Sequence, residues 1–390
     1  MERQAPPFRA EHVGSLIRPA WLIEAKKSQL AGKLPIAELR TLEDKAIREV
    51  VALQESIGFH SITDGEFRRI TYLTEFLSPI GVEFFNGKSP DMVYHDDEGR
   101  TMPATLTRVG RKIAWTTSVN VPAFEFLKGV TKETAKVTIP APTQVHLFAG
   151  KDGIDAKVYP VIDAFWDDMV RAYVSELQAL GKAGCTYVQI DETCIPKLAD
   201  PAIQDVVKRR GPDWRKVLDT YVDVMNRIIR GAPKGMTVAV HHCRGNNAGM
   251  WQAQASYDAV AELMFSTLEA KSYLLEYDSP RAGDFAPLRF MPKDKVAMLG
   301  LVSTKTNAVE TADALKRRIA EASKHADLDR LCVGPQCGFS CGFAGSPLTY
   351  DAQVAKMRRL VEVARDVWNA LSTLMVRRRP EPCEVRRLEP

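Results

Sequence analysis

The sequence predicts one α/β domain of the (β/α)8, or TIM barrel, type, with a β-hairpin insertion after strand 2. Eight short runs of apolar and β-branched residues are spread over nearly the whole chain, and amphipathic helical stretches separate most of them. No long linker of flexible composition interrupts this alternation. We therefore expect a single domain over residues 1–375, followed by an extended tail at 376–390.

The predicted strands are eight short runs that end in polar residues, at 8–13, 60–63, 136–139, 186–190, 236–240, 273–275, 296–301 and 331–333. Apolar residues recur at helical spacing between several of them, over 42–57, 162–180, 217–228 and, after the last strand, 354–368. One segment departs from this alternation. Residues 81–131 combine the turn-rich strings NGKSPDM and HDDEGR with the β-like strings MVYH and KIAWTT, which predicts the hairpin insertion.

Composition excludes several classes of protein. The 390 residues are 45% hydrophobic and 26% charged, and 53 basic against 49 acidic residues leave a net charge of only +4, too little to indicate nucleic-acid binding. The chain contains neither a long apolar stretch nor a secretory signal, so we expect a cytoplasmic protein that does not enter a membrane. Seven cysteines, an odd number, indicate reduced thiols, some of them used for metal binding or catalysis.

Reactive side chains follow most of the predicted strands. In a barrel of this type the active site lies at the carboxyl ends of the strands, so residues that are remote in sequence meet there. The candidates, in chain order, are His12, Ser15, Asp64, Glu66, Asp191, Glu192, His241, His242, Cys243, Glu276, Cys337 and Cys341.

Four of these residues predict a metal site. His241 and Cys243 are two positions apart in extended chain, so their side chains point to the same side, whereas His242 faces the barrel wall. Glu276 from the sixth strand and Cys337 after the eighth complete a set of nitrogen, sulfur and oxygen ligands that suits Zn²⁺. Cys341 is an alternative to Cys337, which we favour because it is nearer the strand end.

Two thiolates and a carboxylate make Zn²⁺ a poor Lewis acid for hydrolysis but keep a bound thiolate electron-rich. Such a site binds a small-molecule thiol, lowers its pKa and presents it as a nucleophile, so the pattern predicts alkyl transfer to sulfur. Glu66, Asp191 and Glu192 are then available to hold the ammonium group of an amino-acid thiol. The alternative for these three acids is a set of structural ion pairs with nearby arginines.

Six strings carry a family resemblance: HVGSLIRP at 12–19, TDGEF at 63–67, QIDET at 189–193, HHCRGN at 241–246, LLEYDSPRAGDFAPLRF at 274–290 and GPQCGF at 334–339. Together they resemble the C-terminal catalytic domain of cobalamin-independent methionine synthase, in particular its stand-alone, single-barrel relatives. The resemblance covers roughly residues 8–372. It implies a zinc-dependent S-methyltransferase that moves a methyl group from methyltetrahydrofolate to homocysteine.

Site residues follow from the resemblance position by position. His241, Cys243, Glu276 and Cys337 match the zinc ligands, while Ser15, Glu66 and Asp191 match the residues that hold the amino-acid part of homocysteine. Two departures concern the methyl donor. The family carries a proton-donating histidine after strand seven, where this chain reads GLVSTKTN, and Phe148 stands about where the full-length enzymes place a tryptophan against the pterin.

These departures leave other functions open. Single-barrel relatives include zinc enzymes that open an epoxide with coenzyme M, so the donor and the thiol can differ from methylfolate and homocysteine. A metal-free barrel resembling porphyrin decarboxylases, or a binding protein without activity, would share the architecture but would have no use for four ligand residues. The sequence leaves the oligomeric state open and allows a homo-oligomer.

Overall fold

The computed structural model describes residues 3–150, 153–343 and 345–377. Its strands are β1 (Ser61–Ile62), β2 (Glu83–His95), β3 (Thr101–Arg108), β4 (Thr134–Pro140), β5 (Tyr187–Asp191), β6 (Thr237–His242), β7 (Ser272–Glu276), β8 (Val296–Val302) and β9 (Leu331–Pro335). Its α-helices are α1 (Ala20–Leu30), α2 (Ile36–Ile57), α3 (Thr74–Ile80), α4 (Val121–Val130), α5 (Thr143–Ala149), α6 (Ile162–Lys182), α7 (Cys194–Lys197), α8 (Pro201–Arg209), α9 (Trp214–Arg230), α10 (Asp258–Thr267), α11 (Ala312–Ala322) and α12 (Tyr350–Arg377). Short 3₁₀ helices are η2 (Pro280–Ala282), η3 (Ala286–Phe290) and η4 (Leu328–Arg330).

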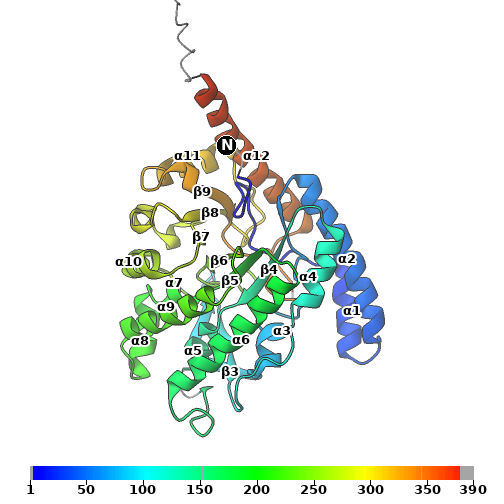
Figure 1. Cartoon of the computed structure of the whole chain (residues 1–390), viewed down its shortest axis with the longest axis vertical. Coiled ribbons are helices and arrows are strands. Elements are labelled where there is room, and N and C mark those ends of the chain that lie inside the picture. The colour runs from blue at the N-terminus through cyan, green and yellow to red at the C-terminus, as the bar shows by residue number, and fades with distance from the viewer. Residues whose placement is uncertain (1–2, 151–152, 344, 378–390) are drawn as a thin grey trace, which may run out of the picture.

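A curved parallel sheet forms the centre of the molecule, and helices surround its outer side (Figure 1). Within the described residues it has seven strands in the order β1-β4-β5-β6-β7-β8-β9, and each pair is parallel. Parallel neighbours place all their carboxyl ends at one edge, so residues that follow different strands approach one another there. The fold is TIM-barrel-like, and this edge holds the predicted site residues.

The predicted first strand, 8–13, is not a regular strand. It makes one parallel bridge, between Ala10 and Val333 of β9, with hydrogen bonds from the Glu11 amide to the Val333 carbonyl at 3.0 Å and from the Val333 amide to the Arg9 carbonyl at 2.9 Å. On its other side it contacts β1 through side chains, among them a 3.1 Å hydrogen bond between His12 Nε2 and the Ser61 carbonyl. Because β1 has only two residues, it offers too few backbone groups to form a regular set of strand hydrogen bonds with segment 8–13.

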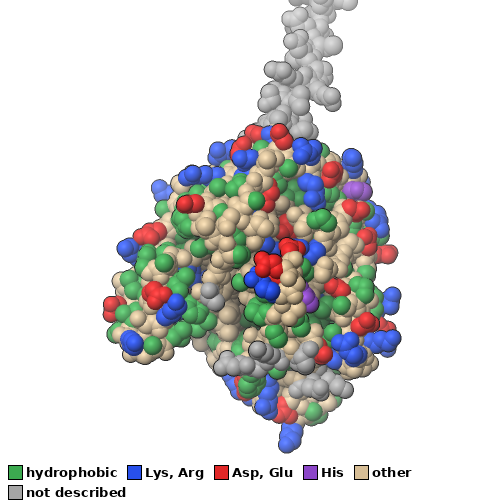
Figure 2. Space-filling model, turned by 180° about the vertical axis from the view of Figure 1, so that it is seen from behind, with side chains coloured by type: hydrophobic (Ala, Val, Ile, Leu, Met, Phe, Trp, Pro, Cys, Tyr) green, Lys and Arg blue, Asp and Glu red, His purple; other side chains and the backbone are tan. Residues whose placement is uncertain are grey.

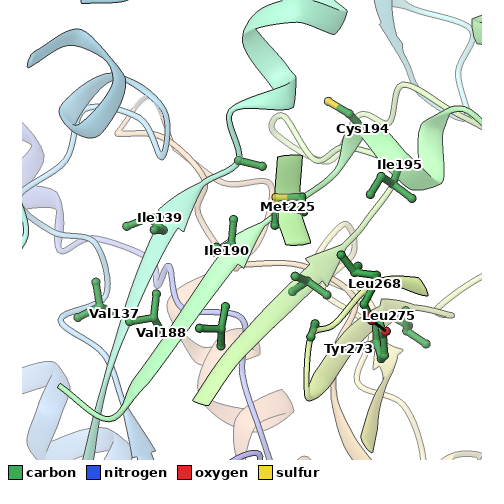
Figure 3. Packing of buried hydrophobic residues seen from close by; sticks show 14 of the residues in the cluster. Val137, Ile139, Val188, Ile190, Cys194, Ile195, Met225, Leu268, Tyr273 and Leu275 are labelled. Carbon is green, nitrogen blue, oxygen red and sulfur yellow. Dashed lines mark hydrogen bonds between the residues drawn. The ribbon is translucent and has the colours of Figure 1, made fainter. Parts of the chain in front are cut away.

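Side chains alternate between the two faces of the sheet, as strand geometry requires. Figure 3 shows Val137 and Ile139 of β4 beside Val188 and Ile190 of β5, packed with apolar residues of the surrounding helices such as Met225 of α9. The residues in the opposite phase, among them Gln189 and His241, point toward the concave, inner side of the sheet, where they are also buried. The helix-facing phase supplies the main hydrophobic core. The other phase supplies polar groups to the interior of the sheet, together with a smaller apolar cluster that includes Tyr187, Ala239 and Leu274.

The segment predicted as an insertion, 81–131, contains an antiparallel pair, β2 and β3, followed by the helix α4. KIAWTT, at 112–117, was expected to be β-like but contains no strand. Its Trp115 indole instead donates to Glu176 of α6 at 2.7 Å. This side-chain hydrogen bond, rather than the backbone hydrogen bonds of a sheet, attaches the segment to the rest of the fold. At the other end of the chain, α12 continues to Arg377, so the first two residues of the predicted tail are helical, and 378–390 lie outside the described residues.

The outer surface carries both signs of charge. On the face in Figure 2, Lys and Arg side chains are interspersed with Asp and Glu, which agrees with the small net charge. Among the helices in the described part of the chain, none has the length and apolar character needed to cross a lipid bilayer.

Candidate functional site

The carboxyl ends of the strands surround a small cavity of about 30 Å³. Six of the seven predicted site residues line it: Ser15, Glu66, Asp191, His241, Cys243 and Cys337. The seventh, Glu276, ends β7 and is fully buried beside the cavity. Strand phase and strand ends therefore bring the predicted residues to one place, although hundreds of residues separate some of them.

Three of the predicted metal ligands converge. One ligand atom each of His241, Cys243 and Cys337 lies within 4.8 Å of the others, and the Sγ atoms of Cys243 and Cys337 are 3.8 Å apart. His241 Nδ1 makes a hydrogen bond of 3.2 Å with the Leu274 carbonyl, which leaves the buried Nε2 without a partner. A carbonyl that orients one ring nitrogen while the other stays free is the usual arrangement of a metal-binding histidine. These side chains fit a metal ion that prefers nitrogen and sulfur.

The electrostatics of the two thiols differ. A hydrogen bond from the Cys337 thiol lowers the pKa of Cys243, and His241 lowers it further against the opposing effect of burial. Cys337 shows the opposite shift. Its hydrogen bonds to Cys243 and to Cys341 raise its pKa, and burial raises the pKa further. Cys243 is therefore the thiol that loses its proton first, and only a thiolate binds a metal well.

Glu276 is held by two donors. The Arg244 amide donates to its Oε2 at 2.6 Å, and the Lys305 ammonium lies 3.4 Å from its Oε1. The backbone of Arg244, the residue after Cys243, thus holds the Glu276 carboxylate in place. Its oxygens are nevertheless not part of the group formed by His241, Cys243 and Cys337.

Lys305 occupies the region after β8 where the resemblance implies a histidine. Its ammonium lies between Glu276, at 3.4 Å, and Asp278, at 3.7 Å, and the side chain is 7% exposed. Burial alone would lower the pKa of Lys305, but Glu276 and Asp278, with a smaller effect from Cys337, together raise it above its usual value. A charged lysine therefore neutralises part of the negative charge beside the ligand group.

Cys341 lies next to the ligand group as well. Its Sγ is 3.9 Å from the Sγ of Cys337, and it lines the same cavity while remaining partly exposed. The cysteines at 185, 194 and 332 are buried elsewhere, and burial raises the pKa of Cys332 to about 12 and that of Cys185 to about 11. Those three are packing residues, and Cys383 lies outside the described residues.

Glu66 and Asp191 form the acidic part of the cavity. Glu66 Oε1 accepts from Thr138 Oγ1 at 2.6 Å and lies 3.3 Å from Arg69, whereas its Oε2 is buried without a partner. Glu66 also has a φ of 61°, a conformation that is rare outside glycine and frequent at functional sites. Burial, with Glu66 adding to it, raises the pKa of Asp191 to about 7. Both carboxylates thus have the capacity to bind a cation.

Glu192 does not belong to this acidic pair. Its Oε1 accepts from the amides of Cys194 and Ile195, at 2.8 and 2.9 Å, and so caps the helix α7. His242 is equally structural, since its Nδ1 makes a 2.6 Å hydrogen bond with the Glu192 carbonyl and its ring stacks on Tyr273. An ion pair with an arginine, the structural role that the sequence left open for these acids, applies in part to Glu66, whereas Glu192 binds the amides at the start of α7.

Ser15 fixes one wall of the cavity. Its carbonyl accepts from the Phe339 amide at 2.9 Å, and a Cβ at position 338 would lie 2.0 Å from its hydroxyl. Gly338 is therefore required for this close approach. The sequence did not reveal Tyr72, which also lines the cavity. Tyr72 precedes α3 and reaches the site only because its segment pairs with residue 341, a contact that strand periodicity does not encode.

Phe148 does not face the cavity. It is 3% exposed, and the Lys197 ammonium lies 5.0 Å from the centre of its ring. Lys197, itself 1% exposed, also donates to Thr193 Oγ1 at 3.1 Å. A planar ligand would have to displace Lys197 to stack on this face of the ring.

Known proteins resemble this chain over most of its length. Residues 10–366 match the family described as "Cobalamin-independent synthase, Catalytic domain". The uncharacterized protein YxjH of Bacillus subtilis is 35% identical over 94% of this chain and 96% of its own, and the methionine synthase of Pyrococcus abyssi is 23% identical over 86% of this chain and 87% of its own.

Two solved structures share the fold. A putative vitamin-B12 independent methionine synthase from Listeria monocytogenes has a TM-score of 0.73 and 30% identity, and covers 94% of this chain and 99% of its own. A B12-independent methionine synthase from Shewanella, solved with selenomethionine, has the same TM-score at 22% identity. The chain therefore belongs to the catalytic-domain family of cobalamin-independent methionine synthases, which are methyltransferases.

Proposed function

We propose that the protein transfers a methyl group to the thiol of homocysteine at a zinc site formed by His241, Cys243, Glu276 and Cys337. The observation that carries the proposal is the unpartnered His241 Nε2 beside two thiols, in the cavity that also contains Glu66 and Asp191. Zn²⁺ bound there would lower the pKa of the acceptor thiol and hold it as a nucleophilic thiolate. Glu276 would complete the ligand set with a carboxylate oxygen, in exchange for its contact with the Lys305 ammonium.

The acids and Ser15 select the acceptor in this proposal. Glu66 Oε2 and the Asp191 carboxylate accept hydrogen bonds from the homocysteine ammonium, and Ser15 contacts its carboxylate end. Methyl transfer then forms an S–C bond and breaks the bond between the methyl group and its donor. The thiol proton leaves on binding, and a donor such as methyltetrahydrofolate gains a proton on the nitrogen that loses the methyl group.

We propose 5-methyltetrahydrofolate as the donor to test first. A relative from Syntrophotalea carbinolica, 23% identical to this chain, is named as a methyltransferase that uses 5-methyltetrahydropteroyltriglutamate and homocysteine, and this chain spans 43% of its length. Because Lys197 covers Phe148, the pterin must bind elsewhere in the mouth of the cavity or displace Lys197. If methyltetrahydrofolate is not the donor, we propose that another methyl donor serves the same acceptor thiol.

The alternative is alkyl transfer from an epoxide to coenzyme M. Its sulfonate would meet Glu66 and Asp191, two buried carboxylates, and like charges repel strongly in a buried site. Family membership favours methyl transfer, and it also disfavours a metal-free barrel resembling porphyrin decarboxylases.

The proposal extends to the architecture and the location of the protein. We infer that the segment 8–13 takes the eighth position and closes the sheet into a (β/α)8 barrel, because it bridges to β9 on one side and contacts Ser61 of β1 on the other. In this interpretation residues 1–375 form one domain with the β2–β3 hairpin as an insertion. The free thiols of the described chain fit a cytoplasmic protein.

Two measurements test the function. Metal analysis of the purified protein should find one zinc per chain. Assays with homocysteine and coenzyme M as acceptors, and with methyltetrahydrofolate, its triglutamate and an epoxide as donors, should give methionine from homocysteine and no product from coenzyme M. A protein that holds no zinc, or that alkylates only coenzyme M, would refute the proposal.

A further inference from the structure

Arg18 connects the two loops that carry the acceptor site and the thiols. Its side chain is almost completely buried, with 5% of the residue exposed. Nη2 donates to the carbonyls of Glu66, at 2.7 Å, and Arg69, at 3.2 Å, in the loop after β1. Nη1 donates to the carbonyls of Ser340, at 3.3 Å, and Gly342, at 3.2 Å, in the loop after β9.

The two loops also pair directly along this line. Thr71 and Gly342 form an antiparallel bridge, the Tyr72 amide donates to the Cys341 carbonyl at 3.2 Å, and the Phe343 amide donates to the Ile70 carbonyl at 2.8 Å. The first loop contains Glu66, and the second contains Cys337 and Cys341. Arg18 therefore joins the carboxylate proposed to hold the ammonium to the loop proposed to hold the metal.

Few side chains could replace arginine here. A planar guanidinium offers five N–H donors in a fixed fork, so that one buried group serves carbonyls on both sides at once. The ammonium of lysine has three donors on a single nitrogen and does not span two loops in this way. The carbonyls that lose their donor would also stay buried, which favours a shift of one loop relative to the other.

We propose that Arg18 is a positioning residue that fixes the distance between Glu66 and the thiols of the loop after β9, and thereby sets which acceptor thiol fits between them. This inference rests on the proposed function, since it concerns how the acceptor is held. An acceptor with an ammonium group must reach Glu66 and the metal together, and a loop shift of about 1 Å is enough to spoil such a fit. A thiol without an ammonium group needs only the metal.

The test compares homocysteine with 3-mercaptopropionate in four variants of the full-length, zinc-loaded protein. Arg18→Gln removes the fork and Arg18→Lys keeps the charge, while Arg330→Gln and Arg330→Lys are matched controls. Arg330 is also largely buried and donates to two carbonyls, of Met291 at 3.2 Å and Pro292 at 2.9 Å, but it lies just before β9, at the end of that strand opposite the cavity. Zinc content, thermal unfolding and the dissociation constants of both thiols are measured for each protein.

We expect Arg18→Gln to keep its zinc and to reduce the preference for homocysteine over 3-mercaptopropionate about tenfold, as the loss of one charge-assisted hydrogen bond would. Arg18→Lys should lose less of the preference, and the Arg330 variants none. Equal weakening of both thiols, or loss of zinc and of the folded state in both Arg18 variants, would overturn the inference. A wild-type protein without any preference would instead refute the ammonium clasp in the proposed function.

Discussion

The Sγ atoms of Cys243 and Cys337 lie 3.8 Å apart, although 94 residues separate them in the chain. Cys243 directly follows β6 and Cys337 follows β9, and two further strands, β7 and β8, lie between these in the sheet. The thiols meet because the sheet curves, so that the ends of non-neighbouring strands face one another across the cavity. The group of side chains that could hold a metal therefore depends on the curvature of the sheet.

Replacement of Cys337 by serine should abolish stoichiometric zinc binding, because serine replaces a soft thiolate by a hydroxyl that stays protonated. Cys341→Ser is the matched control, since its Sγ lies only 3.9 Å from that of Cys337. Mass spectrometry of the metal content and circular dichroism would be compared for both variants. Zinc retained in Cys337→Ser but lost in Cys341→Ser would identify Cys341 as the ligand.

At about pH 8, where Asp191 with its pKa of about 7 is already largely ionised, homocysteine binding should release close to one proton per chain. A free thiol is largely protonated at neutral pH, whereas a metal-bound thiol is a thiolate. Calorimetry in buffers of different ionisation enthalpy measures this number. Binding without proton release, or binding of unchanged strength after removal of the metal by a chelator, would argue against thiolate formation at the site.

Asp191→Asn should weaken the binding of homocysteine by one to two orders of magnitude, roughly the effect of losing a charge-assisted hydrogen bond worth about 1.5 to 3 kcal/mol. It should hardly change the binding of 3-mercaptopropionate, which has no ammonium group. Dissociation constants of the two thiols, measured with the same zinc-loaded protein, separate recognition from metal chemistry. Equal losses for both thiols would assign Asp191 to the fold or to the metal site.

Asp191 should also make stability depend on pH in the metal-free, substrate-free protein. Burial raises its pKa to about 7 from the model-compound value of 3.8, so the folded state keeps a proton that the unfolded state has lost. Stability therefore falls as pH rises between these two values. Asp191→Asn should stabilise the protein increasingly from pH 4 to pH 8, by on the order of 3 kcal/mol at the upper end.

Urea denaturation of the wild type and Asp191→Asn across this pH range measures the difference. Asp223→Asn is the surface control, because the Asp223 side chain is 62% exposed. A difference for Asp191→Asn that stays constant with pH would show that burial does not perturb this carboxyl group.

Lys305→Met should destabilise the metal-free protein by on the order of 3 kcal/mol, because it leaves the buried carboxylates of Glu276 and Asp278 without their cation. The additional change Asp278→Asn should restore part of the loss. Lys316→Met is the surface control: Lys316 pairs with Asp366 at 2.5 Å, but the side chains are 36% and 47% exposed, and such pairs contribute less than about 1 kcal/mol. Equal effects of Lys305→Met and Lys316→Met in urea denaturation would contradict the buried pairing.

The sequence alone predicted the seven described strands of the central sheet, four of the helices around it (α2, α6, α9 and α12) and the side chains at the strand ends. These features follow from short-range patterns: alternation places His241 and Cys243 on one side of β6, and His242 on the other. The same reasoning placed Glu66 and Asp191 at the carboxyl edge, where both line the cavity.

Only the tertiary structure decided which groups at that edge are free to act. Glu192 lies next to Asp191 in sequence, yet its carboxylate caps α7 while Asp191 faces the cavity. Lys305 holds Glu276, and Arg18 joins two loops, through contacts between residues far apart in the chain. Such contacts depend on sheet curvature and loop conformation, which a local periodicity of two or 3.6 residues does not encode. The sequence determined which residues reach the site, and long-range packing determined what each of them binds.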